Sequence, residues 1–262
     1  MNIISEALAH AGKEAIEEIT EIADPALDEV IRSNSLKFSL IAGLVLLLLT
    51  AVSILIKQKS ESLKYILFSL MAVVILSITV YLVGSTIYLN NISATGGPIH
   101  YHADFEIWNC GRQVDLKNPE GLSNKIGTET VHEHADNKIH IEGAVLDLRH
   151  TSLGNFFEVV GGSLDSEHLI IPTNEGRVTM ESGNICPDGT SGVLQTFVLK
   201  TINGEFFQQK VINPKDYVIS PQAQVPPGDC VIFEFGPIRE RTDKLCNFYE
   251  IAIKKGELRI KN

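Results

Sequence analysis

The sequence lacks the short motifs that mark the common enzyme classes. It contains no H-E-x-x-H zinc-protease motif, no G-x-S-x-G nucleophile elbow and no glycine-rich phosphate loop ending in G-K-[ST]. Its four cysteines include no C-x-x-C pair, which excludes the usual redox motif and a cysteine zinc ribbon. No local signature therefore indicates a catalytic class, and catalysis stays a minority hypothesis.

Basic charge is also scarce. The chain has 22 lysines and arginines against 32 aspartates and glutamates, a formal net charge of -10. Residues 99–262 alone carry about -7 and have no basic stripe. Nucleic acid is therefore disfavoured as a partner, because such proteins need positive charge against phosphate.

Charge is absent altogether from two long stretches near the N-terminus. The runs Phe38–Ile56 and Tyr65–Leu89 are uncharged and strongly apolar. Each has the roughly 20 residues that a helix needs to cross a hydrocarbon core about 30 Å thick. We therefore expect transmembrane helices at 36–57 and 65–89, with the lipid bilayer as a partner. The acidic residues before the first run exclude a cleaved signal peptide.

The connector at residues 58–64 indicates the orientation. Lys57–Lys64 reads KQKSESLK, with three lysines and one glutamate. Short loops rich in lysine and arginine stay in the cytoplasm. We therefore predict a two-pass protein of the cell membrane whose termini and large C-terminal domain are extracytoplasmic.

Residues 1–35 carry eight carboxylates and only Lys13 and Arg32 as basic residues. Apolar residues from Ile4 to Ile22 recur at three- and four-residue spacing, which predicts an amphipathic helix. Asp24-Pro25 predicts the start of a short second helix that ends near Ile31. This acidic segment is a solvated leader, or it packs on an envelope protein partner or on the C-terminal domain.

The cysteines all lie in the C-terminal domain, at Cys110, Cys186, Cys230 and Cys246. An even number in an exported domain predicts two disulfides, and the three pairings cannot be distinguished from sequence. The alternative is four free thiols in a cytoplasmic domain.

Residues 90–98 read as a Gly/Pro/Ser/Asn hinge, and residues 99–262 as a mainly β domain. Apolar residues alternate with polar ones from Ile99 to Trp108, and Asn203-Gly204 predicts a hairpin turn. Short helices are expected after Thr151 or Ser152 and after Thr242 or Asp243. Further strands are expected at Arg112–Leu116, around Ile139–Val145, and at Arg177–Glu181, Gly192–Leu199 and Val231–Phe235. The expected fold class is α+β.

Histidine is concentrated in one part of the domain. Five of the eight histidines lie in the 41 residues from His100 to His140, within the phrases HYHADFE and HEHADNKIHIE. On a strand, the H-x-H spacing puts both imidazoles on one face, about 7 Å apart between Cα atoms. The candidate metal ligands are His100, His102, His132, His134, His140 and Glu142.

Imidazole and carboxylate suit transition metals, and copper or zinc is the expected ion outside the cell. Two alternatives remain: solvated polar-face residues, and a proton-sensitive switch built on histidine titration.

Two resemblances accompany this pattern. His100, His102 and Glu106 resemble the first motif of cupins, although the flanking glycines and a second cupin half are missing. The order HxHADFEIW, HEHxDxxIHIEG, SLGxFF, NG and PPGDCVIFEFG is similar to a group of uncharacterised prokaryotic membrane-anchored proteins. That resemblance covers nearly the whole domain. It implies an exported α+β domain with a grasp-like topology, and it implies no activity.

Three hypotheses follow. The first is a tethered metal-binding module, and the second is a metal-dependent enzyme with Glu106, Glu133, Asp136 or Glu142 as base. The third is an interaction module with incidental histidines, which predicts that the two H-x-H pairs lie apart.

Overall fold

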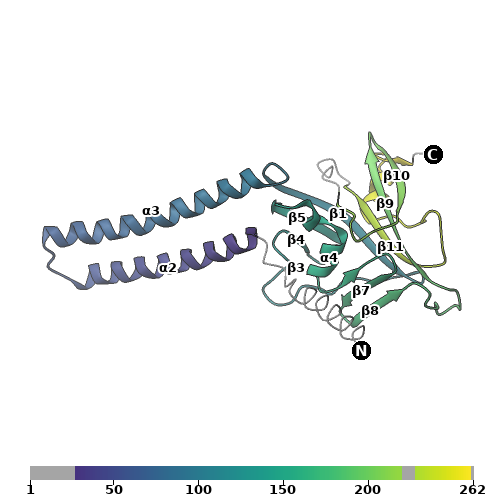
Figure 1. The fold of residues 1–262 in the computed structure, drawn as a ribbon, viewed down its shortest axis with the longest axis horizontal. Helices are drawn as coiled ribbons and strands as arrows, with labels where there is room; N and C mark the ends of the chain where they lie inside the picture. The colour runs from purple at the N-terminus through teal and green to yellow at the C-terminus, as the bar shows by residue number, and fades with distance from the viewer. Residues whose placement is uncertain (1–26, 220–227, 261–262) are drawn as a thin grey trace, which may run out of the picture. The chain divides into compact units, whose positions relative to one another are not determined.

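The computed structural model describes residues 27–219 and 228–260 (Figure 1). The chain divides between Leu89 and Asn90 into two compact units. The predicted amphipathic helix between Ile4 and Ile22, and most of the acidic segment 1–35, lie outside the described residues.

The first unit contains two long apolar helices, α2 (Leu27–Leu55) and α3 (Glu61–Ile92). Helix α2 runs without a break from Leu27, so the prediction of a separate short helix ending near Ile31 is wrong. No proline or glycine follows Ile31 to end it there, and Ser35 Oγ donates to the Ile31 carbonyl within the continuing helix (2.8 Å). Helix α3 begins earlier than expected, where Ser60 Oγ accepts a hydrogen bond from the Leu63 N–H (3.3 Å).

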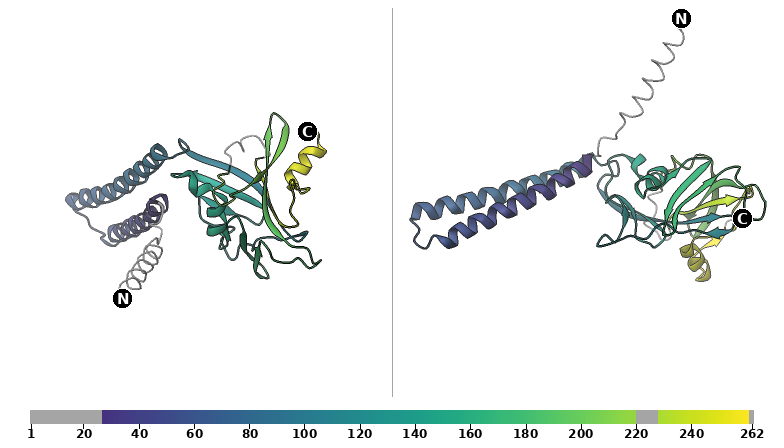
Figure 2. Two further views of the ribbon diagram at one scale, coloured as in Figure 1. Left: turned by 45° about the vertical axis from the view of Figure 1, so that its right-hand side comes forward. Right: turned by 90° about the horizontal axis from the view of Figure 1, so that it is seen from below.

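The two helices lie side by side as a hairpin (Figures 1 and 2). The Phe38 and Tyr81 rings meet edge to face, with centroids 5.1 Å apart. Within α2 and α3 only the Leu67 side chain is buried, and most of the large apolar side chains are exposed. Both helices are long and apolar enough to cross a membrane.

The second unit is a mostly β domain with two short helices, which confirms the α+β class. Its main sheet has nine strands in the order β12-β10-β9-β11-β1-β5-β4-β3, with β2 also paired to β1. The central pair, β1 and β11, is parallel. The strands are β1 (Pro98–Asn109), β2 (Arg112–Gln113), β3 (Ile126–Gly127), β4 (Val131–Glu133), β5 (Lys138–Ala144), β9 (Val193–Ile202), β10 (Glu205–Val211), β11 (Cys230–Gly236) and β12 (Arg259–Ile260).

A second, three-stranded sheet was not foreseen as a unit. It contains β6 (Ser163–Leu164), β7 (His168–Thr173) and β8 (Gly176–Glu181), of which only β8 was predicted.

The predicted strand Arg112–Leu116 is limited to β2. The Asn203-Gly204 hairpin is confirmed, and both residues have positive φ (52° and 78°), as a type I′ turn requires.

Each face of the main sheet supports its own core. Tyr101, Ala103, Phe105 and Ile107 of β1 face the larger core, which includes α4 (Leu153–Val159) and the small sheet. Trp108, on the opposite face, packs against the smaller core beneath α5 (Asn247–Lys254). The alternation in β1 therefore separates two environments, and the histidines share the α5 face.

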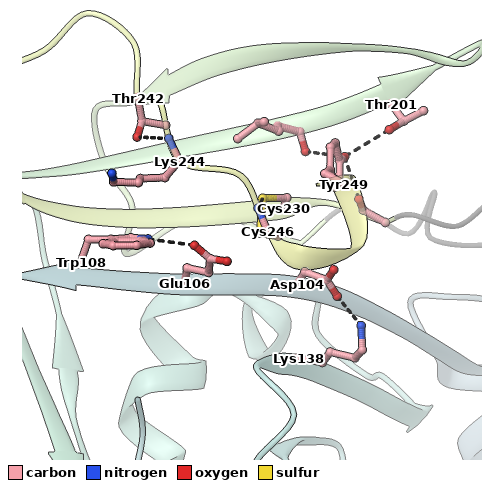
Figure 3. The surroundings of a disulfide bond; sticks show 12 residues. Asp104, Glu106, Trp108, Lys138, Thr201, Cys230, Thr242, Lys244, Cys246 and Tyr249 are labelled. Carbon is pink, nitrogen blue, oxygen red and sulfur yellow. Dashed lines mark hydrogen bonds and ion pairs between the residues drawn. A yellow bond between two sulfur atoms is a disulfide. The ribbon is translucent and has the colours of Figure 1, made fainter. Parts of the chain in front are cut away.

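Both disulfides are present, as predicted, and the structure pairs Cys110 with Cys186 and Cys230 with Cys246. No described cysteine is free. Cys246 is the N-cap of α5, so the second disulfide ties this helix to the start of β11 (Figure 3). The predicted cap at Thr242 or Asp243 is wrong, because the disulfide fixes the helix start at Cys246 and no side chain caps it by hydrogen bonding.

The helix α4 prediction is confirmed: Ser152 is its N-cap and accepts a hydrogen bond from the Asn155 N–H (3.2 Å). A 3-10 helix, η1 (Leu148–Thr151), precedes it. The segment expected to be a hinge is anchored, since the Ala94 N–H (2.8 Å) and Ser93 Oγ (3.0 Å) both donate to the Val145 carbonyl. The start of β1 is thereby held beside the end of β5.

Candidate metal centre

Three neighbouring strands bring the predicted residues together. In the sheet register, His102 of β1 lies opposite His140 of β5, and His132 of β4 lies opposite His140 from the other side. His100 lies opposite Glu142 one step along the same face. Cross-strand neighbours on one face have Cβ atoms about 5 Å apart, so the three strands present one continuous polar patch.

The ligand atoms form two sets. Nitrogen or oxygen atoms of His100, His102, His140 and Glu142 all lie within 4.8 Å of one another, and so do those of His132, His134 and His140. All six candidate residues belong to these sets, and His140 belongs to both. The two H-x-H pairs therefore meet, and the separation that the third hypothesis predicts is not observed.

Individual distances in the first set are shorter still. The Nε2 atoms of His100 and His102 are 3.0 Å apart, and His100 Nε2 is 3.2 Å from Glu142 Oε1. His132 Nε2 approaches the same oxygen at 4.0 Å. Glu142 is therefore the carboxylate closest to both H-x-H pairs.

The rings contact one another across the whole patch. His102 and His140 have centroids 4.4 Å apart, and His132 stacks nearly parallel to His140 at 5.4 Å. His134 meets His140 edge to face at 4.7 Å. The five imidazoles thus form one cluster centred on His140.

Two ring nitrogens have acceptors outside the patch. His140 Nε2 lies 3.1 Å from a carboxylate oxygen of Asp136, and His134 Nδ1 contacts the Asn124 carbonyl. A neutral ring that donates one N–H keeps a lone pair on its other nitrogen. Such donations orient metal-binding histidines in proteins. They favour Nδ1 of His140 and Nε2 of His134 as ligand atoms.

The turn between β4 and β5 is held by Glu133. Its Oε1 accepts from the N–H groups of Asp136 (2.7 Å) and Asn137 (3.1 Å). Ala135 and Asn137 both have positive φ, which is unfavourable for alanine. We infer that Glu133 stabilises this turn through Oε1 and so positions His134 and Asp136.

Gly127 permits the close approach of β3 to β4. A Cβ atom there would lie 2.5 Å from the Val131 carbonyl oxygen and 3.0 Å from the His132 Cα, at a φ of +109°. Only glycine fits at this position. Strand β3 can therefore cover His132, which is buried.

Burial keeps three of the imidazoles neutral near physiological pH. It lowers the pKa of His102 and His132, and it lowers the pKa of His140 to about 4 despite the opposing effect of Asp136. Metal binding needs the unprotonated ring. These three side chains are therefore ready to bind an ion without first losing a proton.

Glu106 lies elsewhere on β1. It accepts a hydrogen bond from Trp108 Nε1 (2.8 Å), and it is four residues beyond His102, about 13 Å along an extended strand. Glu142 of β5, rather than Glu106, accompanies His100 and His102.

Sequence reasoning named Asp136 only as a base and did not identify Asn124. The spacing of Asp136 and His140 across a tight turn gives a weak signal for their contact. The Asn124 carbonyl gives none, because any residue supplies a backbone oxygen.

Comparison with protein-family models, with curated proteins and with solved structures gives no significant match.

Proposed function

We propose that this protein is a membrane-anchored, extracytoplasmic metal-binding protein that holds a divalent transition-metal ion, Zn²⁺ or Cu²⁺, in the histidine cluster. The observation that carries the proposal is the convergence of five imidazoles and one carboxylate from β1, β4 and β5 and from the turn after β4, where His134 lies. The first set alone offers four donors, which is enough to complete a tetrahedral site.

The spacing of the donors supports a metal. In tetrahedral zinc sites with Zn–N distances of 2.0–2.1 Å, ligand atoms lie about 3.4 Å apart. The separations of 3.0 Å and 3.2 Å around His100 Nε2 are close to this value. Small side-chain movements would bring His140 to the same ion, since all four atoms are already within 4.8 Å.

The donor chemistry narrows the choice of ion. Only imidazole nitrogen and carboxylate oxygen are present in the two sets. All four cysteines are in disulfides, so thiolate is not offered to a soft ion such as Cu(I). Imidazole-rich sites suit Zn²⁺ and Cu²⁺.

The apolar helices support a membrane anchor. At 1.5 Å per residue, α2 and α3, with 29 and 32 residues, are longer than the roughly 30 Å of a hydrocarbon core. Their exposed leucine, isoleucine and valine side chains would form a very large apolar surface in water. Lys57, Lys59 and Lys64 favour a cytoplasmic connector, and the two disulfides favour an oxidising compartment for the domain.

We further propose a grasp-like topology for the domain, a relationship to the prokaryotic membrane-anchored proteins that it resembles, and an envelope partner for the acidic segment 1–35. The parallel central pair β1–β11 is compatible with a grasp-like sheet.

Metal content is the test of this function. The full chain, with any affinity tag removed, is purified in detergent without chelators and analysed for its elements. We expect about one equivalent of zinc or copper, and its loss in His132→Ala/His134→Ala. The matched control is His150→Ala/His168→Ala, which removes two histidines outside the cluster. Absence of metal, together with no tight uptake of added Zn²⁺ or Cu²⁺, would refute the proposal.

A further inference from the structure

The two ligand sets differ in their access to solvent. We define the outer set as His100, His102, Glu142 and His140, and the inner set as His132, His134 and His140. The His100 and Glu142 side chains are 63% and 37% exposed, whereas that of His132 is 1% exposed and that of His134 is half-buried. An ion arriving from solvent therefore meets His100 and Glu142 before it reaches His132.

The shared residue limits how many ions can bind. His140 Nε2 lies within hydrogen-bond distance of Asp136, so its neutral ring has one lone pair left for a metal. A second ion on the same ring would require removal of the remaining ring proton. His140 can therefore serve the outer set or the inner set, one at a time.

The negative charge of the cluster also limits it to one divalent ion. Glu142 and Asp136 are the carboxylates in contact with the imidazoles, and they supply two negative charges. One divalent ion balances them, whereas a second would leave two uncompensated positive charges in a partly buried site.

Resting on the metal-binding function above, we propose that a single divalent ion has two alternative positions in this cluster. The outer set captures the ion, and the inner set retains it. In the transfer, bonds from His100, His102 and Glu142 to the metal break and bonds from His132, His134 and one solvent water form, while His140 stays bound, so the ion keeps four ligands. No electron is transferred, and the ion keeps its charge.

This arrangement predicts different consequences for the two H-x-H pairs. Removing the outer pair, His100 and His102, removes the ligands that capture the ion but leaves the inner set intact. Capture and release of the ion are then both slowed about tenfold, and the equilibrium affinity changes much less. Removing the inner pair leaves capture fast but speeds release, with an affinity loss of about 100-fold or more, the upper end of what loss of a supporting group costs. His140→Gln impairs both steps.

Zinc kinetics on the full chain in detergent test the proposal. Association is followed by stopped-flow with a zinc-sensitive dye and dissociation by excess chelator, for wild type, His100→Ala/His102→Ala, His132→Ala/His134→Ala and His140→Gln. The control is His150→Ala/His168→Ala, and the corresponding His→Gln pairs are used if an alanine pair does not give a folded protein by circular dichroism. The expected wild-type stoichiometry is one.

Two results would overturn the two-position site while leaving the metal-binding function intact. Two equivalents in wild type, with one retained by each pair variant, would show independent sites. Equal changes in both rates for both pair variants would show one undivided centre. Failure of the wild type to bind zinc or copper would instead refute the metal-binding function itself.

Discussion

The two ends of one face of β1 follow the same alternation but have different surroundings. Asp104, Glu106 and Trp108 lie toward one end, where α5 and the Cys230–Cys246 disulfide cover them (Figure 3). His100 and His102 continue the same polar alternation toward the other end, beside β5 and β4, and remain partly exposed. Alternation therefore defines a face, and the segment that packs on it decides whether that face joins a core or carries the histidine cluster.

The border between the two ends is an ion pair. Lys138 Nζ lies 2.5 Å from Asp104 Oδ1 and 4.3 Å from the centroid of the Phe248 ring of α5. On the far side, His102 is the next residue of the same face. The covered end and the histidine end can thus be altered separately, and three variants test this.

The largest effect is expected at the covered end. Replacing the disulfide in Cys230→Ser/Cys246→Ser should lower the free energy of unfolding by about 3 kcal/mol, because a loop of roughly 15 residues is no longer closed in the unfolded chain. Zinc affinity should stay within about threefold. Urea unfolding followed by Trp108, the single tryptophan, and zinc titration measure the two quantities. Loss of zinc binding in the folded variant would show that the ends are coupled.

A smaller effect is expected from acid at the histidine end. The pKa of His140 is lowered by burial to about 4, from an ordinary value of about 6.5, so the unfolded chain takes up this proton at higher pH than the folded chain does. The contribution of His140 to the free energy of unfolding is therefore complete above pH 6.5 and is lost as the pH falls toward 4. Between about pH 7 and pH 5 the free energy of unfolding falls by about 2 kcal/mol.

Urea unfolding of the metal-free protein at several pH values measures this dependence. His140→Gln should reduce its slope. His168→Gln is the control, because that exposed histidine has its pKa raised, mainly by a hydrogen bond to Asp165. An unchanged slope in His140→Gln would contradict the assignment.

The smallest effect is expected at the border. Lys138→Gln leaves Asp104 without its ion-pair partner in a mostly buried position, at a cost of about 1 kcal/mol. Zinc affinity and the capture rate should not change, because neither residue belongs to a ligand set. Urea unfolding measures the loss of stability, and the stopped-flow assay with a zinc-sensitive dye measures the zinc affinity and the capture rate. A tenfold loss of zinc affinity would place Lys138 within the site.

Patterns with short-range causes were predictable. The strict alternation of β1, the Asn203-Gly204 turn and the Ser152 cap each depend on residues close in sequence, and each is observed. The start of α5 was not predictable, since it is set by a disulfide to Cys230, 16 residues away. The strands β3 and β6 have only two residues each, too few for a period to be recognised.

His100 and His102 could be chosen from sequence because H-x-H spacing on a strand places both rings on one face whatever the strand's neighbours are. The second pair was chosen from the same spacing, but His134 lies in the turn just after β4. The uncharged helices and the even number of cysteines are likewise properties of the chain itself. The tertiary structure decided the rest. The pairing of β1, β5 and β4 made His140 the shared residue, and burial then set its pKa. Register and burial depend on contacts between segments distant in sequence, and local spacing does not specify them.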